Sequence, residues 1–128
     1  MKLLLDTHTV IWWMEGSEKL SSKVKAMLGA DANELYVSTA SVWEIAIKAS
    51  LGKLPEFKGG AKAFLKRLEN IPVTLLPIAP RHIETVETLP FHHRDPFDRL
   101  LIATAKVDGM TLLTSDANLH KYGVRHAW

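Results

Sequence analysis

Close to its start the chain carries the segment Lys2-Leu3-Leu4-Leu5-Asp6, a short apolar run that ends in a carboxylate. A continuous run of this length is typical of a strand buried on both faces of a parallel sheet. A second segment, Thr111-Leu112-Leu113-Thr114-Ser115-Asp116, repeats the pattern near the other end of the chain. The two segments predict buried strands, each with an aspartate just beyond its carboxyl end.

Between these two segments, strands alternate with helices. Two further strands are expected over residues 35–38 and 73–76. One helix is expected to follow Asp6 and to stop at residues 15–17, and a second is expected to be capped by Ser21 and Ser22. Four more helices are expected over residues 40–51, 61–70, 80–88 and 96–107, and a loop is expected over residues 55–60. This alternation predicts an α/β fold with a mainly parallel sheet covered by helices on both faces.

The bulk composition is that of one compact domain spanning residues 1–128, of which 47% are hydrophobic. The chain has no cysteine, which excludes disulfides, thiol catalysis and cysteine-ligated zinc. No apolar run approaches the ~18–20 residues of a membrane-spanning helix, and no secretory signal is evident. A cytoplasmic protein without a membrane partner is expected. The net charge of +2 is too balanced to indicate nucleic-acid binding by itself.

Two acids are expected at one edge of the sheet. In open α/β sheets ligands bind beyond the carboxyl ends of the strands. If the strands that precede Asp6 and Asp116 are parallel neighbours, these two carboxylates converge there. The alternative for each is a helix N-cap, because aspartate is a favoured capping residue.

Two other acids lie on predicted helices. Glu44 interrupts the apolar run Val42-Trp43-Glu44-Ile45, and it could bind an ion or form an ordinary ion pair with Lys48 four residues later. Asp98 follows Asp95 and Pro96, which suit the N-cap and the first position of a helix, so it could complement the helix dipole or point into the cleft.

Four carboxylates at one edge repel one another unless protons or cations bind among them. Oxygen ligands favour hard cations, so Mg²⁺ or Mn²⁺ fits best, and the chemistry that suits such a site is phosphodiester hydrolysis. A zinc site is disfavoured, because His92 and His93 are adjacent and lack the spacing of a helical zinc pair. Most histidines are expected on the surface or in loops, with His8 the one nearest the cleft.

Four motifs occur in an order that resembles the PIN domain, and in particular the VapC-type toxins of toxin–antitoxin pairs. They are Asp6-Thr7-His8, Ser41-Val42-Trp43-Glu44-Ile45, Asp95-Pro96-Phe97-Asp98-Arg99-Leu100-Leu101-Ile102-Ala103 and Leu113-Thr114-Ser115-Asp116. The resemblance runs from Lys2 to about Tyr122 and implies a PIN-like three-layer α/β/α fold with four to five strands.

The resemblance also implies an activity and its residues. It implies a Mg²⁺- or Mn²⁺-dependent endoribonuclease that acts on RNA, forms a homodimer and is blocked by a cognate antitoxin. The implied catalytic and metal-binding residues are Asp6, Glu44, Asp98 and Asp116. Auxiliary residues near the site are Thr7, Asp95, Thr114 and Ser115, and RNA phosphates are expected to contact Lys48, Arg94 and Arg99.

Two other functions compete with this interpretation. A phosphatase or phosphotransferase could use Asp6 as a covalent nucleophile, but that chemistry usually needs a second acid two residues later, where this chain has His8. A non-catalytic interaction domain would not require four acids at one edge.

Overall fold

A parallel sheet forms the centre of the molecule. The computed structural model describes residues 1–55 and 57–128. The strands lie in the order β3-β2-β1-β4-β5, and every neighbouring pair is parallel. The strands are β1 (Lys2–Leu5), β2 (Glu34–Ser38), β3 (Val73–Leu76), β4 (Thr111–Leu113) and β5 (His126–Ala127). The predicted α/β class and parallel sheet are confirmed.

Seven helices are found among the described residues. They are α1 (Thr7–Glu15), α2 (Ser22–Gly29), α3 (Thr39–Ser50), α4 (Gly60–Leu68), α5 (Pro80–Glu87), α6 (Pro96–Asp108) and α7 (Ala117–His120). Most predicted boundaries agree within one or two residues. The predicted loop over residues 55–60 includes Glu56, which lies outside the described residues. None of the helices in the described ranges is long and apolar enough to cross a membrane.

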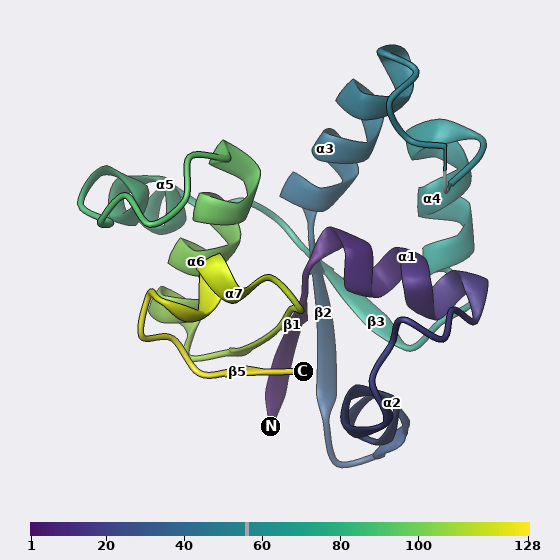
Figure 1. Ribbon diagram of the computed structural model, residues 1–128, viewed down its shortest axis with the longest axis horizontal. Helices are drawn as coiled ribbons and strands as arrows, with labels where there is room; N and C mark the ends of the chain where they lie inside the picture. The colour runs from purple at the N-terminus through teal and green to yellow at the C-terminus, as the bar shows by residue number, and fades with distance from the viewer. Residues whose placement is uncertain (56) are drawn as a thin grey trace.

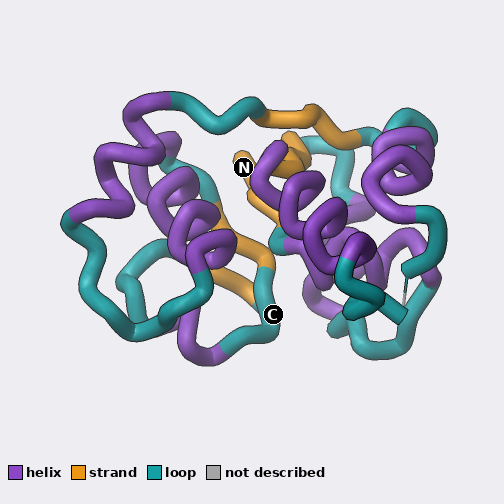
Figure 2. Tube along the Cα trace, turned by 90° about the horizontal axis from the view of Figure 1, so that it is seen from above, coloured by secondary structure: helices purple, strands orange, loops and turns teal. Residues whose placement is uncertain are grey.

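The three leucines of β1 divide the core between the two faces of the sheet. Side chains alternate along a strand, so Leu3 and Leu5 face one layer and Leu4 faces the other. Leu3 and Leu5 belong to the cluster that includes Val10 of α1 and Phe64 of α4. Leu4 packs with the second cluster, to which α6 contributes four of the ten buried residues. Figures 1 and 2 show helices on both sides of the strands, as the predicted three-layer arrangement requires.

The short strand β5 was not located by the sequence pattern. It has two residues, of which only Ala127 is buried, and it pairs with β4 through Leu113. A segment this short has no periodicity of its own, so its strand conformation depends on the neighbouring β4 edge.

The sheet register places the strand ends side by side. Leu5 is aligned with Leu113 of β4 and with Val37 of β2, so the residues that follow these strands emerge at the same edge. The backbone N–H of Asp6 donates to the carbonyl of Leu113 at 3.2 Å, which ties the two strand ends together. The functional site lies at this edge.

Candidate metal centre

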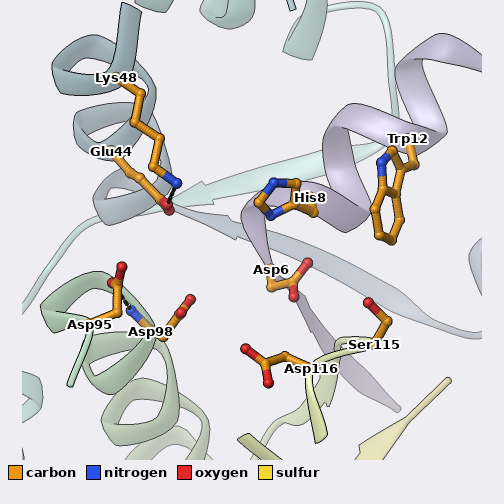
Figure 3. Close-up of a pocket in the computed structure, with 9 residues that line it drawn as sticks. All are labelled: Asp6, His8, Trp12, Glu44, Lys48, Asp95, Asp98, Ser115 and Asp116. Carbon is orange, nitrogen blue, oxygen red and sulfur yellow. Dashed lines mark hydrogen bonds and ion pairs between the residues drawn. The ribbon is translucent and has the colours of Figure 1, made fainter. Parts of the chain in front are cut away.

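A polar pocket of about 370 Å³ opens beyond the carboxyl ends of β1 and β4. Five carboxylates line it, together with one lysine, one serine and two aromatic rings (Figure 3). The lining residues are Asp6, His8, Trp12, Glu44, Lys48, Asp95, Asp98, Ser115 and Asp116. All four acids that the sequence singled out therefore face one pocket, although they come from four different segments of the chain.

Asp6 caps α1 and lines the pocket at the same time. Its Oδ1 accepts hydrogen bonds from the backbone N–H and the hydroxyl of Thr9, both at 2.7 Å. Burial raises the pKa of Asp6 above its usual value, although the hydrogen bonds from Thr114 and Thr9 lower it in part. The capping interpretation and the pocket interpretation of this residue are thus both correct.

Glu44 is buried on α3 and has a partner for each oxygen. The Thr7 hydroxyl donates to Oε1 at 2.7 Å and also lies 2.9 Å from the Ser41 hydroxyl. The Lys48 ammonium donates to Oε2 at 2.6 Å, which is the ion pair expected four residues along the helix. Burial alone would lower the pKa of Lys48, but the hydrogen bond to Glu44 and its charge raise it. The ion pair therefore forms part of the pocket wall.

Asp98 is costly to ionise in this pocket. It lies in the first turn of α6, where Asp95 is the N-cap and accepts hydrogen bonds from the backbone N–H groups of Phe97 and Asp98. Burial is the main cause that raises the pKa of Asp98 to about 8, and the neighbouring carboxylates Asp95, Glu44, Asp6 and Asp116 raise it further. Without a cation, the pocket holds a proton on this carboxyl group at neutral pH.

His93 joins Asp98 and Asp116, and the sequence analysis did not single it out. Its Nε2 lies 3.3 Å from Asp116 Oδ2 and 3.4 Å from Asp98 Oδ2. Its Nδ1 accepts the backbone N–H of Asp95 at 3.0 Å, so the neutral ring carries its proton on Nε2 and directs it at the carboxylates. His93 is in a loop without periodicity, and only its position just before Asp95 could have indicated it.

The carboxyl end of β4 is held by the hydroxyl groups of Thr9 and Thr114. Thr114 is buried; its hydroxyl accepts the backbone N–H of Asp116 at 3.1 Å and also hydrogen-bonds to Asp6. Asp116 caps the short helix α7 through the backbone N–H of Asn118. Ser115 is exposed and lines the pocket. Thr114 thus joins the carboxylates that follow β1 and β4.

The donor set fits a hard divalent cation. A ring nitrogen of His93 and carboxylate oxygens of Asp98 and Asp116 lie within 4.8 Å of one another, and Asp6 faces Asp116 across the pocket in Figure 3. Because the neutral His93 ring keeps its proton on the nitrogen that faces the acids, the ligands available to an ion are carboxylate oxygens. Oxygen ligands favour Mg²⁺ or Mn²⁺ over zinc. Such an ion would offset the charge that raises the pKa of Asp98.

One of the three predicted phosphate contacts is wrong. Arg99 is only 5% exposed and its guanidinium donates to the carbonyls of Pro90, Val86 and Leu89 and to the Tyr122 hydroxyl. Its donors satisfy carbonyl groups in the last turn of α5 and just after it, so it is a structural residue rather than a phosphate ligand. Lys48 lines the pocket. Arg94 is exposed but is not among the described lining residues.

One histidine departs from the expectation that most histidines are on the surface or in loops. His82 is fully buried, its Nδ1 accepts the backbone N–H of Ala79, and its Nε2 lies 2.8 Å from Asp108. It therefore joins the start of α5 to the end of α6. His8 is exposed and lines the pocket, as expected.

Comparisons with known proteins point to one family. The family model of the PIN domain matches residues 3–124. Ribonuclease VapC22 of Mycobacterium tuberculosis is 31% identical over 121 residues, which cover 94% of this chain and 91% of that protein.

Solved structures share the fold at low sequence identity. The VapBC2 complex of Rickettsia felis, bound to a DNA fragment from its promoter, contains a chain with a TM-score of 0.72 and 12% identity, covering 99% of this chain and 98% of that one. A chain of the DNA-bound VapBC complex of Salmonella typhimurium has a TM-score of 0.69 and 16% identity, covering 99% and 97%. VapC20 of Mycobacterium tuberculosis, described as a sarcin-ricin loop cleaving toxin, has a TM-score of 0.62 and 14% identity, covering 95% of each chain.

Proposed function

This chain belongs to the PIN-domain family, and from that membership and its acidic pocket we propose that it is a divalent-metal-dependent endoribonuclease, the toxin of a toxin–antitoxin pair. The observation that carries the proposal is the pocket itself, in which five carboxylates from separate segments face one another. The ribonuclease activity of the relative VapC22 supports the choice of RNA as substrate. Because the proposed substrate is cellular RNA, we propose that the enzyme acts in the cytoplasm.

We propose that Asp6, Glu44, Asp98 and Asp116, the four acids that share the pocket, hold Mg²⁺ or Mn²⁺. When bound, the cation supplies positive charge to the scissile phosphate and favours ionisation of the attacking water. Deprotonated Asp98 would then act as a ligand, and His93 would keep the carboxylates of Asp98 and Asp116 together through its Nε2–H. Partners of this kind fix the orientation of metal ligands.

The residues around these acids position them. Thr7 and Lys48 fix the two oxygens of Glu44, so the glutamate presents one orientation to the pocket. Lys48 also places a positive charge beside the acids, where it can approach an RNA phosphate, because its side chain is about one-third exposed. Arg94 is a second candidate for a phosphate contact, farther from the acids.

The test is RNA cleavage by the purified protein with Mg²⁺ or Mn²⁺, with EDTA, and with excess ion restored after EDTA. We expect cleavage only when the ion is present. Asp6→Asn and Asp116→Asn should lower the cleavage rate more than about 100-fold, because loss of outer-sphere partners alone costs 10- to 100-fold. Asparagine is as good an N-cap as aspartate, so these variants keep the capping role and change only the charge.

Asp31→Asn is the matched control, because Asp31 is exposed in the turn between α2 and β2, away from the pocket lining. It should cleave RNA as the unaltered protein does. Cleavage that persisted in folded Asp6→Asn and Asp116→Asn would overturn the proposal. Turnover of a small phosphomonoester in EDTA would point instead to covalent chemistry on Asp6.

A cognate antitoxin and a second copy of this chain are the protein partners that we propose. Support comes from the VapBC complexes that share the fold. Co-expression with the product of an adjacent reading frame should yield a complex whose RNA cleavage is suppressed. Light scattering of the free protein should give the mass of two chains, and a monomer at micromolar concentration would contradict the dimer.

A further inference from the structure

The wall of the acidic pocket on the side of α1 is aromatic, which cation binding does not require. Trp12 and His8 lie on one turn of α1, and Figure 3 shows Trp12 on the opposite side of the pocket from Lys48, with His8 between them. Carboxylate oxygens alone suffice to hold a divalent ion. The indole therefore offers contact to a different part of the substrate.

The indole of Trp12 is held in place by its neighbours. It packs partly buried against the core cluster of the α1 side. Trp128 makes an edge contact with it at 5.6 Å between ring centroids, and the His8 ring lies tilted at 5.7 Å. The Lys19 ammonium lies 5.7 Å from the indole centroid. The pocket thus has an aromatic side chain whose position is set by Trp128 and His8, and a cation outside the pocket lining lies over its ring.

Nucleic acids combine an anionic phosphate backbone with flat bases that have apolar faces. Proteins that bind single strands combine basic side chains along the backbone with aromatic side chains on which bases stack. Sequence-specific RNA recognition in particular uses unpaired bases placed on aromatic rings. Because Trp12 shares one pocket with Asp6 and Asp116, a base in contact with it belongs to a nucleotide next to the scissile phosphate.

We propose that Trp12 forms, with His8 and Lys19 beside it, a stacking site for an unpaired nucleobase that adjoins the scissile phosphate of single-stranded RNA. The inference rests on the proposed ribonuclease function and deepens it, since it names the form of RNA that the pocket accepts. The base packs against the indole, and the Lys19 ammonium faces the backbone phosphate of the same segment.

The test uses a short single-stranded RNA that the protein cleaves, and a set of the same RNAs with an abasic residue at each position flanking the scissile bond. We expect an abasic residue at one flanking position to lower kcat/KM by about 5- to 150-fold, the range found for loss of one base stack. Trp12→Leu should lower kcat/KM for the intact RNA by a similar factor. In that variant the abasic residue at the same position should cause no further loss, and Trp12→Phe should restore most of the activity.

Trp13→Leu is the matched control, because Trp13 neighbours Trp12 on α1 and is also partly buried against the core, but it does not line the pocket. It should leave the response to the abasic residue unchanged. Equal abasic losses in the unaltered protein and in Trp12→Leu, or undiminished cleavage by Trp12→Leu, would overturn the stacking site and leave the ribonuclease function standing. Absence of RNA cleavage by the unaltered protein with either ion would overturn both.

Discussion

Replacement of Asp98 by asparagine should stabilise the metal-free protein at neutral pH while removing its response to metal. Burial and the surrounding acids raise the pKa of Asp98 from 3.8 to about 8 in the folded chain. Between about pH 4 and pH 8, the unfolded chain has lost a proton that the native state keeps. The native state therefore becomes less stable, relative to the unfolded chain, as pH rises through this window.

The size of the effect follows from the same two pKa values. At pH 7 the unfolded carboxyl group lies 7 − 3.8, about 3.2 pH units, above its pKa, and each unit corresponds to about 1.36 kcal/mol. Holding the proton in the native state thus costs about 4 kcal/mol at pH 7. Asparagine has the same shape and does not ionise, so Asp98→Asn should raise the free energy of unfolding by about 2–4 kcal/mol at pH 7 and change it little at pH 4.

Urea unfolding in EDTA at pH 4, 5.5, 7 and 8.5 measures this difference. Addition of Mn²⁺ at pH 7 should stabilise the unaltered protein, because binding to the native state shifts the equilibrium, and should stabilise Asp98→Asn much less. Asp31→Asn should follow the unaltered protein throughout. If Asp98→Asn has the same pH dependence as the unaltered protein, or is less stable in EDTA at pH 7, the electrostatic reasoning is wrong.

Three further changes test other parts of the structure. Arg99→Lys should lower the free energy of unfolding by about 2–4 kcal/mol, because lysine cannot donate to the same set of carbonyl groups. A loss under about 1 kcal/mol in urea unfolding would contradict this prediction. His93→Phe should weaken Mn²⁺ binding, measured by thermal shift, by about 10- to 100-fold. His93→Gln keeps an N–H donor and should weaken Mn²⁺ binding less. Equal effects of the two substitutions would show that the hydrogen bond is unimportant. The hydrogen bond from Arg81 is the main cause that lowers the pKa of Asp108 in the folded chain. This carboxylate therefore stabilises the native state above the pKa that it has in the unfolded chain. That stability is lost as pH falls through the folded pKa. Asp108→Asn should therefore destabilise the protein at pH 7 but not near pH 2, and an equal loss at both pH values in urea unfolding would refute the charge-based explanation.

Local signals predicted the framework of the site well. The apolar runs before Asp6 and Asp116 indicated buried strands, and the register of β1 with β4 brings both strand ends to one edge. The pair Asp95 and Pro96 indicated the start of a helix, and α6 begins there. These signals succeed because strand burial and helix capping depend on residues close together in the chain.

Arg99 and His93 show where local signals fail. Arg99 follows Asp98 on the same helix, and its sequence neighbours do not reveal that the carbonyl groups after α5 surround it. The sequence favours a surface or loop position for most histidines and disfavours a helical zinc pair at His92 and His93, so His93 was not expected at the site. Its contacts with Asp98 and Asp116 join residues that are 5 and 23 positions away, and only the packed chain brings them together.

By itself the amino-acid sequence determined the order of β1 to β4 and of α1 to α6, and the placement of an acid after each of two buried strands. Tertiary structure alone decided that Glu44 and Asp98 face those acids, that His93 joins two of them, and that Trp12 forms the aromatic wall beside them. The physical reason is the separation in sequence over which the interactions act. Backbone propensity and helix capping act between residues close together in the chain. Burial, repulsion among carboxylates and ring contacts depend on which distant segments pack against each other.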